Sequence, residues 1–440
     1  MEEAYGPKDF RTRETMGAVS TERHPRLLPV AEEARVTPIE LFFDLVFVFS
    51  LTQVTALMGD HLSWQGVARG ILVLGLLWWC WVGYAWLGNV VQAEEGLGRA
   101  AIFAAMGAMF VMALTVPEAF DDLEGGLDGP VVLAFAYLAV RLLHLTVFWL
   151  AARTEHDRAL RGQLLRFMPS LIGSTVLLLV ASQLTGRAQT LMWVGVLTVD
   201  YVGVILGGAA GWRLRSASHF AERHGLIVIV ALGESIVAIG VGVARLPISW
   251  PIIAGAVSGL TIAACLWWAY FDVVSIVAER ELRRLDGEAR TRMARDAYSY
   301  LHLPMVAGIV LVALGVEEVL HQVGDASHGE LSLGLPILPL TALYGGVAVF
   351  LFAHLAFKYR TWRRVTVRRL AVAVLLCALI PLARELPALA ALGLVTVILV
   401  VMIASEAIRY AEAREQVRHE DGGPDVHGQG RAHPQAGIAE

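Results

Sequence analysis

Charged residues are scarce in this sequence. Asp, Glu, Lys and Arg make up only 17% of its 440 residues, against about a quarter in soluble domains. Hydrophobic residues make up 56%, and the mean hydropathy is +0.60. This composition excludes a soluble enzyme of a few domains and a disordered chain. The formal net charge of −5 gives no support for a nucleic-acid partner.

Cysteine is scarce as well. Cys80, Cys265 and Cys377 all lie in apolar runs, so they offer neither a disulfide framework nor a cluster of metal ligands. No histidine pair has the spacing of a zinc-binding helix, and neither a nucleophile elbow nor a phosphate-binding glycine loop occurs. We therefore expect no metal and no other cofactor, and the sequence gives little support for an enzyme.

Long apolar runs are abundant. Twelve of them are long enough to cross a bilayer core, which takes about 20 helical residues. The sequence therefore predicts an all-α polytopic membrane protein whose main partner is the lipid bilayer. The predicted spans are 36–58, 68–91, 99–118, 130–152, 163–184, 188–211, 224–244, 248–276, 296–319, 335–357, 367–384 and 386–408.

The distribution of Lys and Arg predicts the orientation of these spans. With the N-terminus in the cytoplasm, the cytoplasmic segments carry 30 basic residues and the external connections carry 4. Such an excess is typical of the cytoplasmic side. We expect a multi-pass protein of a bacterial cytoplasmic membrane with both termini inside. The polar ends, 1–35 and 411–440, are predicted to be disordered tails.

The even number of spans raises the question of internal duplication. The pair Trp78-Trp79 recurs as Trp267-Trp268 at an offset of 189, and Asp44 aligns with Glu234 at an offset of 190. Chance is the competing explanation, because apolar helices draw on few residue types. Duplication would give two parallel six-helix halves, 36–211 and 212–410.

Several ionisable side chains lie inside the predicted spans. Each costs about 2.5–3.5 kcal/mol on insertion scales and therefore needs a partner or a task. Glu40 and Asp44 lie one turn apart on the first span, and Glu234 lies near the middle of the seventh. We expect these three acids to bind a cation or exchange protons in a central polar cavity. The alternative is structural, with Asp44 or Glu234 paired to Arg141 or to a histidine.

Other polar and small residues support this prediction less directly. Arg141, His144, Asp200 and Asp272 are candidates for a supporting role around the ion site, although a purely structural role fits Asp200 and Asp272 equally well. A stripe of small residues predicts close approach of another helix, either within the chain or in a homo-oligomer. The stripe consists of Gly203, Gly207 and Gly211.

Three motifs resemble the signatures of the bacterial low temperature requirement A family. They are VTPIELFFDLVFVFSLTQV from Val36, WWCWVGYAWLGN from Trp78 and HFAERHGLIVIVALGESIVAIG from His219. The resemblance covers most of the predicted membrane region and implies a polytopic protein named for a cold-growth phenotype, without a biochemical activity. The matching signature positions are Glu40, Phe43, Asp44, His219, Glu222, Arg223, His224, Gly233, Glu234 and Ser235.

The polar start of the seventh span has two interpretations. His219, Glu222, Arg223 and His224 could gate a path to Glu234, since histidine passes protons near neutral pH. They could equally anchor the head of a helix, where an acid suits the helix dipole.

The sequence thus predicts a proton- or cation-coupled transporter or an ion-conducting protein, acting on an unidentified small solute or ion. One alternative is an intramembrane enzyme for a lipid or isoprenoid substrate, with the same acids, one of His144, His302 and His354, and a lateral opening to lipid. The other is a sensor of membrane state needed for growth in the cold.

Overall fold

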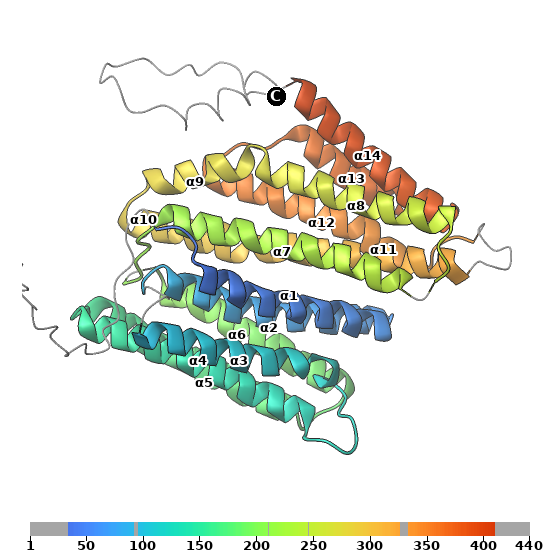
Figure 1. Ribbon diagram of the computed structural model, residues 1–440. Coiled ribbons are helices and arrows are strands. Elements are labelled where there is room, and N and C mark those ends of the chain that lie inside the picture. The colour runs from blue at the N-terminus through green and yellow to red at the C-terminus, as the bar shows by residue number, and fades with distance from the viewer. Residues whose placement is uncertain (1–33, 92–95, 210, 245, 326–332, 410–440) are drawn as a thin grey trace, which may run out of the picture.

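The computed structural model describes residues 34–91, 96–209, 211–244, 246–325 and 333–409. The described residues form helices and connections and contain no strand. The helices lie side by side in one bundle (Figure 1). The predicted tails lie outside the described residues, apart from Ala34 and Arg35 at the end of the first tail.

Each predicted span contains a helix, but fewer than twelve qualify as spans. Among the described residues, ten segments are long and apolar enough to cross a membrane, whereas the apolar stretch Gly98–Leu114 and the 17-residue helix Val367–Ala383 are shorter. The all-α polytopic class is therefore confirmed. The helices are α1 (Pro38–Asp60), α2 (Trp64–Gly88), α3 (Gly96–Leu114), α4 (Gly129–Thr154), α5 (Arg158–Ala181), α6 (Gly186–Gly207), α7 (Ala217–Val243), α8 (Trp250–Phe271), α11 (His302–Asp325), α12 (Ile337–Trp362), α13 (Val367–Ala383) and α14 (Ala388–Arg409).

The connection between α8 and α11 is more ordered than hydropathy indicates. It contains α9 (Val274–Arg284), α10 (Gly287–Met293) and the π-helical segment η2 (Ala294–Tyr300). In α9 the apolar residues Val274, Ala278 and Leu282 recur every fourth position and are buried. This spacing makes α9 amphipathic, so it packs on the bundle through one face. A short single-turn helix, η1 (Val116–Glu118), follows α3.

The helices α1 and α7 lie next to each other near the middle of the bundle, with α3 to α6 on one side and α8, α12, α13 and α14 on the other (Figure 1). Their polar contacts join residues with the same sequence separation at each level, so the two helices run in the same direction and in register. The pairs are Glu40–His219, Asp44–Arg223 and Thr55–Glu234, each separated by 179 residues.

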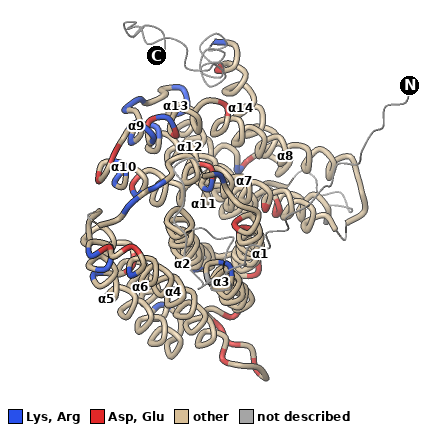
Figure 2. Tube along the Cα trace, turned by 60° about the vertical axis from the view of Figure 1, so that its left-hand side comes forward, with Lys and Arg blue, Asp and Glu red and all other residues tan. Residues whose placement is uncertain are grey.

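Charge is concentrated at one end of the bundle. Figure 2 shows Lys and Arg gathered around α9, α10 and neighbouring helix ends, whereas the helix bodies are mostly uncharged. The loop between η1 and α4 is acidic and contains Asp121, Asp122 and Glu124. We call the basic end, marked by α9 and α10, the α9–α10 end.

The glycine stripe of α6 packs against α5 of the same chain. A Cβ atom at Gly203 would lie 2.9 Å from Cβ of Ser170, and one at Gly207 would lie 3.4 Å from Nε2 of Gln163. Close approach of the two backbones therefore requires small residues there. The helix ends at Gly207 rather than at the predicted residue 211, because Gly208 has a φ of 72°.

Candidate functional site

Two carboxylates on α1 share one guanidinium on α7. Arg223 Nη1 lies 3.0 Å from Glu40 Oε1, and Arg223 Nη2 donates to Asp44 Oδ1 at 2.9 Å. None of the three side chains is more than 2% exposed. The spacing of four residues places both carboxylates on one face of α1, where the planar fork of the arginine bridges them.

Further donors surround this group. His219 Nε2 lies 3.0 Å from Glu40 Oε2, which also accepts the backbone N–H and the hydroxyl of Thr37. The indole N–H of Trp81 on α2 donates to Asp44 Oδ1 at 2.8 Å. We call Glu40, Asp44, His219, Arg223 and Trp81 the inner cluster. Among the described residues, Asp44 Oδ2 has no hydrogen-bond partner.

The inner cluster has more acid than base. Glu40 and Asp44 carry two negative charges when ionised, whereas Arg223 supplies one permanent positive charge. An uncompensated charge buried in a membrane helix is costly. One bound proton removes the excess. The inner cluster is therefore suited to binding and releasing one proton.

Gly88 on α2 leaves room for the Glu40 carboxylate. A Cβ atom at Gly88 would lie 2.2 Å from Glu40 Oε1, well inside contact distance. We expect Gly88→Ala to lower the free energy of unfolding by about 1–3 kcal/mol, as overpacking of a close-packed interior does. Thermal unfolding in detergent measures the effect. Gly240→Ala is the matched control, because its Cβ atom would meet nothing within 4 Å, and an equal loss in both variants would refute the packing role.

Glu234 occupies a second level on α7. Its side chain is 0% exposed, and its Oε1 accepts the Thr55 hydroxyl of α1 at 2.8 Å. Among the described residues, the other oxygen, Oε2, has no hydrogen-bond partner. No cation neutralises this carboxyl group in the described part of the chain, so a bound proton or cation is favoured there.

Asp44 and Glu234 lie at different levels of the α1–α7 interface. The register partner of Glu234 is Thr55, eleven residues beyond Asp44 on α1, which corresponds to about 16 Å along a helix. The sequence predicts one cavity between the two acids. The structure instead places them at two levels of one interface. The buried residues of α1 and α7 between these levels are mostly apolar; the buried polar exceptions are Ser50, whose hydroxyl donates to Val46 O within α1, and His224. This apolar layer consists of Phe47, Leu51, Val54, Ile227, Val228 and Ala231.

Residues of α7, α8, α9 and α10 line a cavity at the α9–α10 end. This cavity, which we call the vestibule, has a volume of about 780 Å³. Leu226 and Ile229 line both the vestibule and a second cavity of about 380 Å³, which reaches Asp44. The vestibule is lined by charged side chains of both signs, namely Arg35, Arg215, Glu222, Glu279, Arg283 and Arg290.

The other predicted gate residues divide between these regions. Glu222 faces the vestibule and accepts the backbone N–H of Val36 at 3.2 Å. His224 is buried, with its Nδ1 at 2.9 Å from Phe220 O and its ring 5.2 Å from that of His302. Ser235 donates its hydroxyl to Leu232 O within α7 at 2.7 Å. The start of α7 thus joins the vestibule to the inner cluster.

Arg141 and Asp200 form a separate buried group. Arg141 Nη2 lies 3.8 Å from Asp200 Oδ1, and Asp200 Oδ2 accepts the Tyr137 hydroxyl at 2.5 Å. The sequence proposed Arg141 as a partner of Asp44 or Glu234, whereas the structure places it beside Asp200. His144 lies one turn further along α4. Asp272 follows the last residue of α8, where it forms the C-cap.

Sequence reasoning missed several buried residues that make polar contacts between helices. Thr55 and Trp81 have no charge, so hydropathy does not distinguish them from packing residues, although both lie in the family motifs or next to them. Arg369 binds Glu406 at 2.7 Å and also contacts His354, joining α12, α13 and α14. Its partner lies 37 residues away, so no local spacing reveals the pair.

Comparison with known proteins places these groups in a family context. The family model described as bacterial low temperature requirement A protein (LtrA) matches residues 35–404. An uncharacterized protein of Rhizobium meliloti (strain 1021) is 31% identical over 312 residues, which cover 68% of this chain and 74% of that protein. No solved structure matches the chain. The matched region contains both levels of the α1–α7 interface.

Proposed function

This chain belongs to the bacterial low temperature requirement A family, and from that premise we propose that it moves protons or another monovalent cation across the bacterial cytoplasmic membrane. The path follows the α1–α7 interface, with Glu234 and the inner cluster as the two binding levels. The observation that carries the proposal is Glu234, a fully buried acid in a long apolar helix, with one oxygen that has no partner in the described part of the chain. Ionisable groups in such positions mark ion and proton pathways.

Acidic residues lead from the far end of the bundle toward Glu234. Glu317 on α11 acts electrostatically on Glu234, and its side chain is 20% exposed. A Cβ atom at Gly242 of α7 would lie 3.3 Å from Glu317 Cγ, so the two helices are in close contact at this level. Asp60, at the end of α1, acts electrostatically on Glu317. An acidic entrance raises the local concentration of cations.

The opposite end supplies the second entrance. Basic residues concentrate at the α9–α10 end (Figure 2), which the positive-inside rule assigns to the cytoplasm. In the proposed path the vestibule leads from the cytoplasm toward the inner cluster, and the acidic entrance faces outward. The apolar layer separates the two levels, so transfer between them requires that the layer opens or hydrates. Hydrophobic constrictions of this kind act as gates.

Ion flux into liposomes that contain the purified protein tests the role of Glu234. Imposed proton, sodium and potassium gradients identify the ion, and dyes report internal pH and membrane potential. We expect Glu234→Gln to reduce the flux about tenfold or more, because the amide cannot take up a proton or offset a cation's charge. Glu318→Gln is the matched control on α11, since Glu318 is only partly buried. Equal flux in wild type and Glu234→Gln would refute this role.

A lipid-modifying enzyme is the second candidate. The cavity that reaches Asp44 is also lined by Leu41, Phe42 and Leu45, whose exposed fractions are 44%, 52% and 61%. Exposed apolar side chains on a spanning helix face lipid, so this cavity has a lateral opening. Of the histidines considered for such chemistry, His302 pairs with the Tyr270 hydroxyl and His354 contacts Arg369. Lipids modified only by wild type, and not by Asp44→Asn, would favour the enzyme over the transporter.

A further inference from the structure

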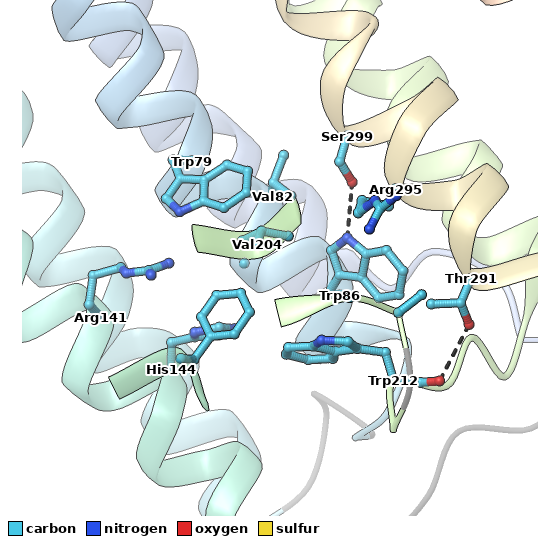
Figure 3. Close-up of a pocket in the computed structure, with 14 residues that line it drawn as sticks. Trp79, Val82, Trp86, Arg141, His144, Val204, Trp212, Thr291, Arg295 and Ser299 are labelled. Carbon is cyan, nitrogen blue, oxygen red and sulfur yellow. Dashed lines mark hydrogen bonds between the residues drawn. The ribbon is translucent and has the colours of Figure 1, made fainter. Parts of the chain in front are cut away.

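A small cavity lies on the side of α2 away from the inner cluster. Its volume is about 50 Å³, enough for a few water molecules or one small ion and far below the 300–1,000 Å³ of typical organic-ligand pockets. Trp79, Trp86 and Trp212 form much of its wall, with Arg141 and His144 on one side and Arg295 on the other (Figure 3). We call it the tryptophan cavity.

The polar groups of this cavity are mainly donors without acceptors. Arg141 Nε and Nη2 and the indole nitrogen of Trp79 are donors without a hydrogen-bond partner among the described residues; His144, whose two ring nitrogens also lack one there, adds one donor in its neutral form. All three side chains are at most 4% exposed. Buried polar atoms are normally hydrogen-bonded, so a group of unpartnered donors calls for an acceptor that the chain does not supply.

The remaining polar side chains of the wall are already occupied. Trp86 donates its indole N–H to the Ser299 hydroxyl at 3.0 Å, and the Thr291 hydroxyl donates to Trp212 O at 3.3 Å (Figure 3). In the described residues neither hydroxyl accepts from Arg141 Nε, Arg141 Nη2 or Trp79 Nε1. The unmet capacity of the tryptophan cavity is therefore for an acceptor.

The charge of Arg141 is incompletely compensated. Its Nη2 lies 3.8 Å from Asp200 Oδ1, beyond hydrogen-bond distance. On the other side of the cavity Arg295 pairs with Asp296, and both side chains are partly exposed. An anion in the cavity would accept from Arg141 and also offset its charge, whereas water would only accept.

We propose that the tryptophan cavity binds one small monovalent anion, of halide or short-carboxylate size. Arg141 supplies the charge, and the N–H groups of Trp79 and His144 supply directional hydrogen bonds. Arg295, whose side chain is 17% exposed, lies at the mouth on the α9–α10 end. The site is distinct from the α1–α7 interface, because Trp79 faces the tryptophan cavity whereas Trp81 binds Asp44 on the inner cluster.

Tryptophan fluorescence of the purified protein in detergent tests the proposal, since three indoles line the cavity. Chloride and formate are titrated against gluconate at constant ionic strength, with thermal unfolding as a second readout. We expect a saturable change in wild type and an affinity at least about tenfold lower in Arg141→Met/Asp200→Asn, because a charged hydrogen bond is lost. The double substitution keeps the charge balance, so that Asp200 is not left unpaired.

Matched variants keep the result interpretable. Trp79→Phe retains the ring but removes a donor, and should weaken binding without unfolding the protein. Arg153→Met, at the end of α4, and Glu234→Gln, which tests the ion path, should both bind the anion like wild type. Absence of a saturable change in wild type, or an unchanged affinity in Arg141→Met/Asp200→Asn, would overturn the proposal.

Discussion

Arg223→Met is expected to lower the free energy of unfolding by about 3–5 kcal/mol, the range for removing one partner of a buried ion pair. The substitution leaves Glu40 and Asp44 one turn apart, almost fully buried and without their shared cation. Only His219 would then face Glu40 with a positive charge, and only when it is protonated. Unfolding in detergent, followed by circular dichroism, measures the loss.

A second substitution distinguishes charge from packing. In Arg223→Met/Asp44→Asn the remaining acid, Glu40, keeps His219 as its partner, so we expect more than half of the lost stability to return. Arg187→Met, at the exposed start of α6, should change stability little. If the double variant is as unstable as Arg223→Met, the charge account of the inner cluster is wrong.

Leu51→Asn is expected to raise passive ion leak about tenfold or more. Leu51 is 0% exposed and lies four residues before Thr55, within the apolar layer between the two levels. A polar side chain there draws water into the layer and lowers the dewetting barrier. Proton leak into liposomes without an imposed solute measures the effect. Leu343→Asn, on α12, is the control for general loosening, because Leu343 is also 0% exposed but lies outside the α1–α7 interface.

An equal leak in Leu51→Asn and Leu343→Asn would place the barrier elsewhere. Both substitutions also cost stability, because each removes a buried aliphatic side chain. The leak rate is therefore divided by the amount of folded protein, which is isolated beforehand as the monodisperse fraction. A leak confined to Leu51→Asn would link the α1–α7 interface to the permeation path.

Local spacing predicts part of the candidate site. The four-residue spacing of Glu40 and Asp44 places them on one helical face, and the structure brings both to Arg223. That partner could not be identified in advance, because it lies 179 residues away on α7. The aligned positions of Asp44 and Glu234 also predict one level, whereas helix register places the acids on two. Register depends on how two helices pack, which hydropathy does not record.

Hydropathy predicts the spanning helices well because each must be apolar over about 20 residues. It fails between α8 and α11, where α9 combines buried Val274, Ala278 and Leu282 with arginines on its other face. Its average hydropathy is low, although one face packs firmly. The same limit applies to Arg141 and Asp200, whose pairing across α4 and α6 depends on the position of the two helices.

The most direct test of the central claim is the flux of wild-type protein compared with Asp44→Asn and Glu234→Gln in the same liposomes. The account predicts a proton or monovalent-cation flux clearly above that of protein-free liposomes. It also predicts that either substitution reduces this flux about tenfold or more, because the ion must bind at both levels of the α1–α7 interface. The absence of flux under proton, sodium and potassium gradients, or flux unchanged in both variants, would contradict it.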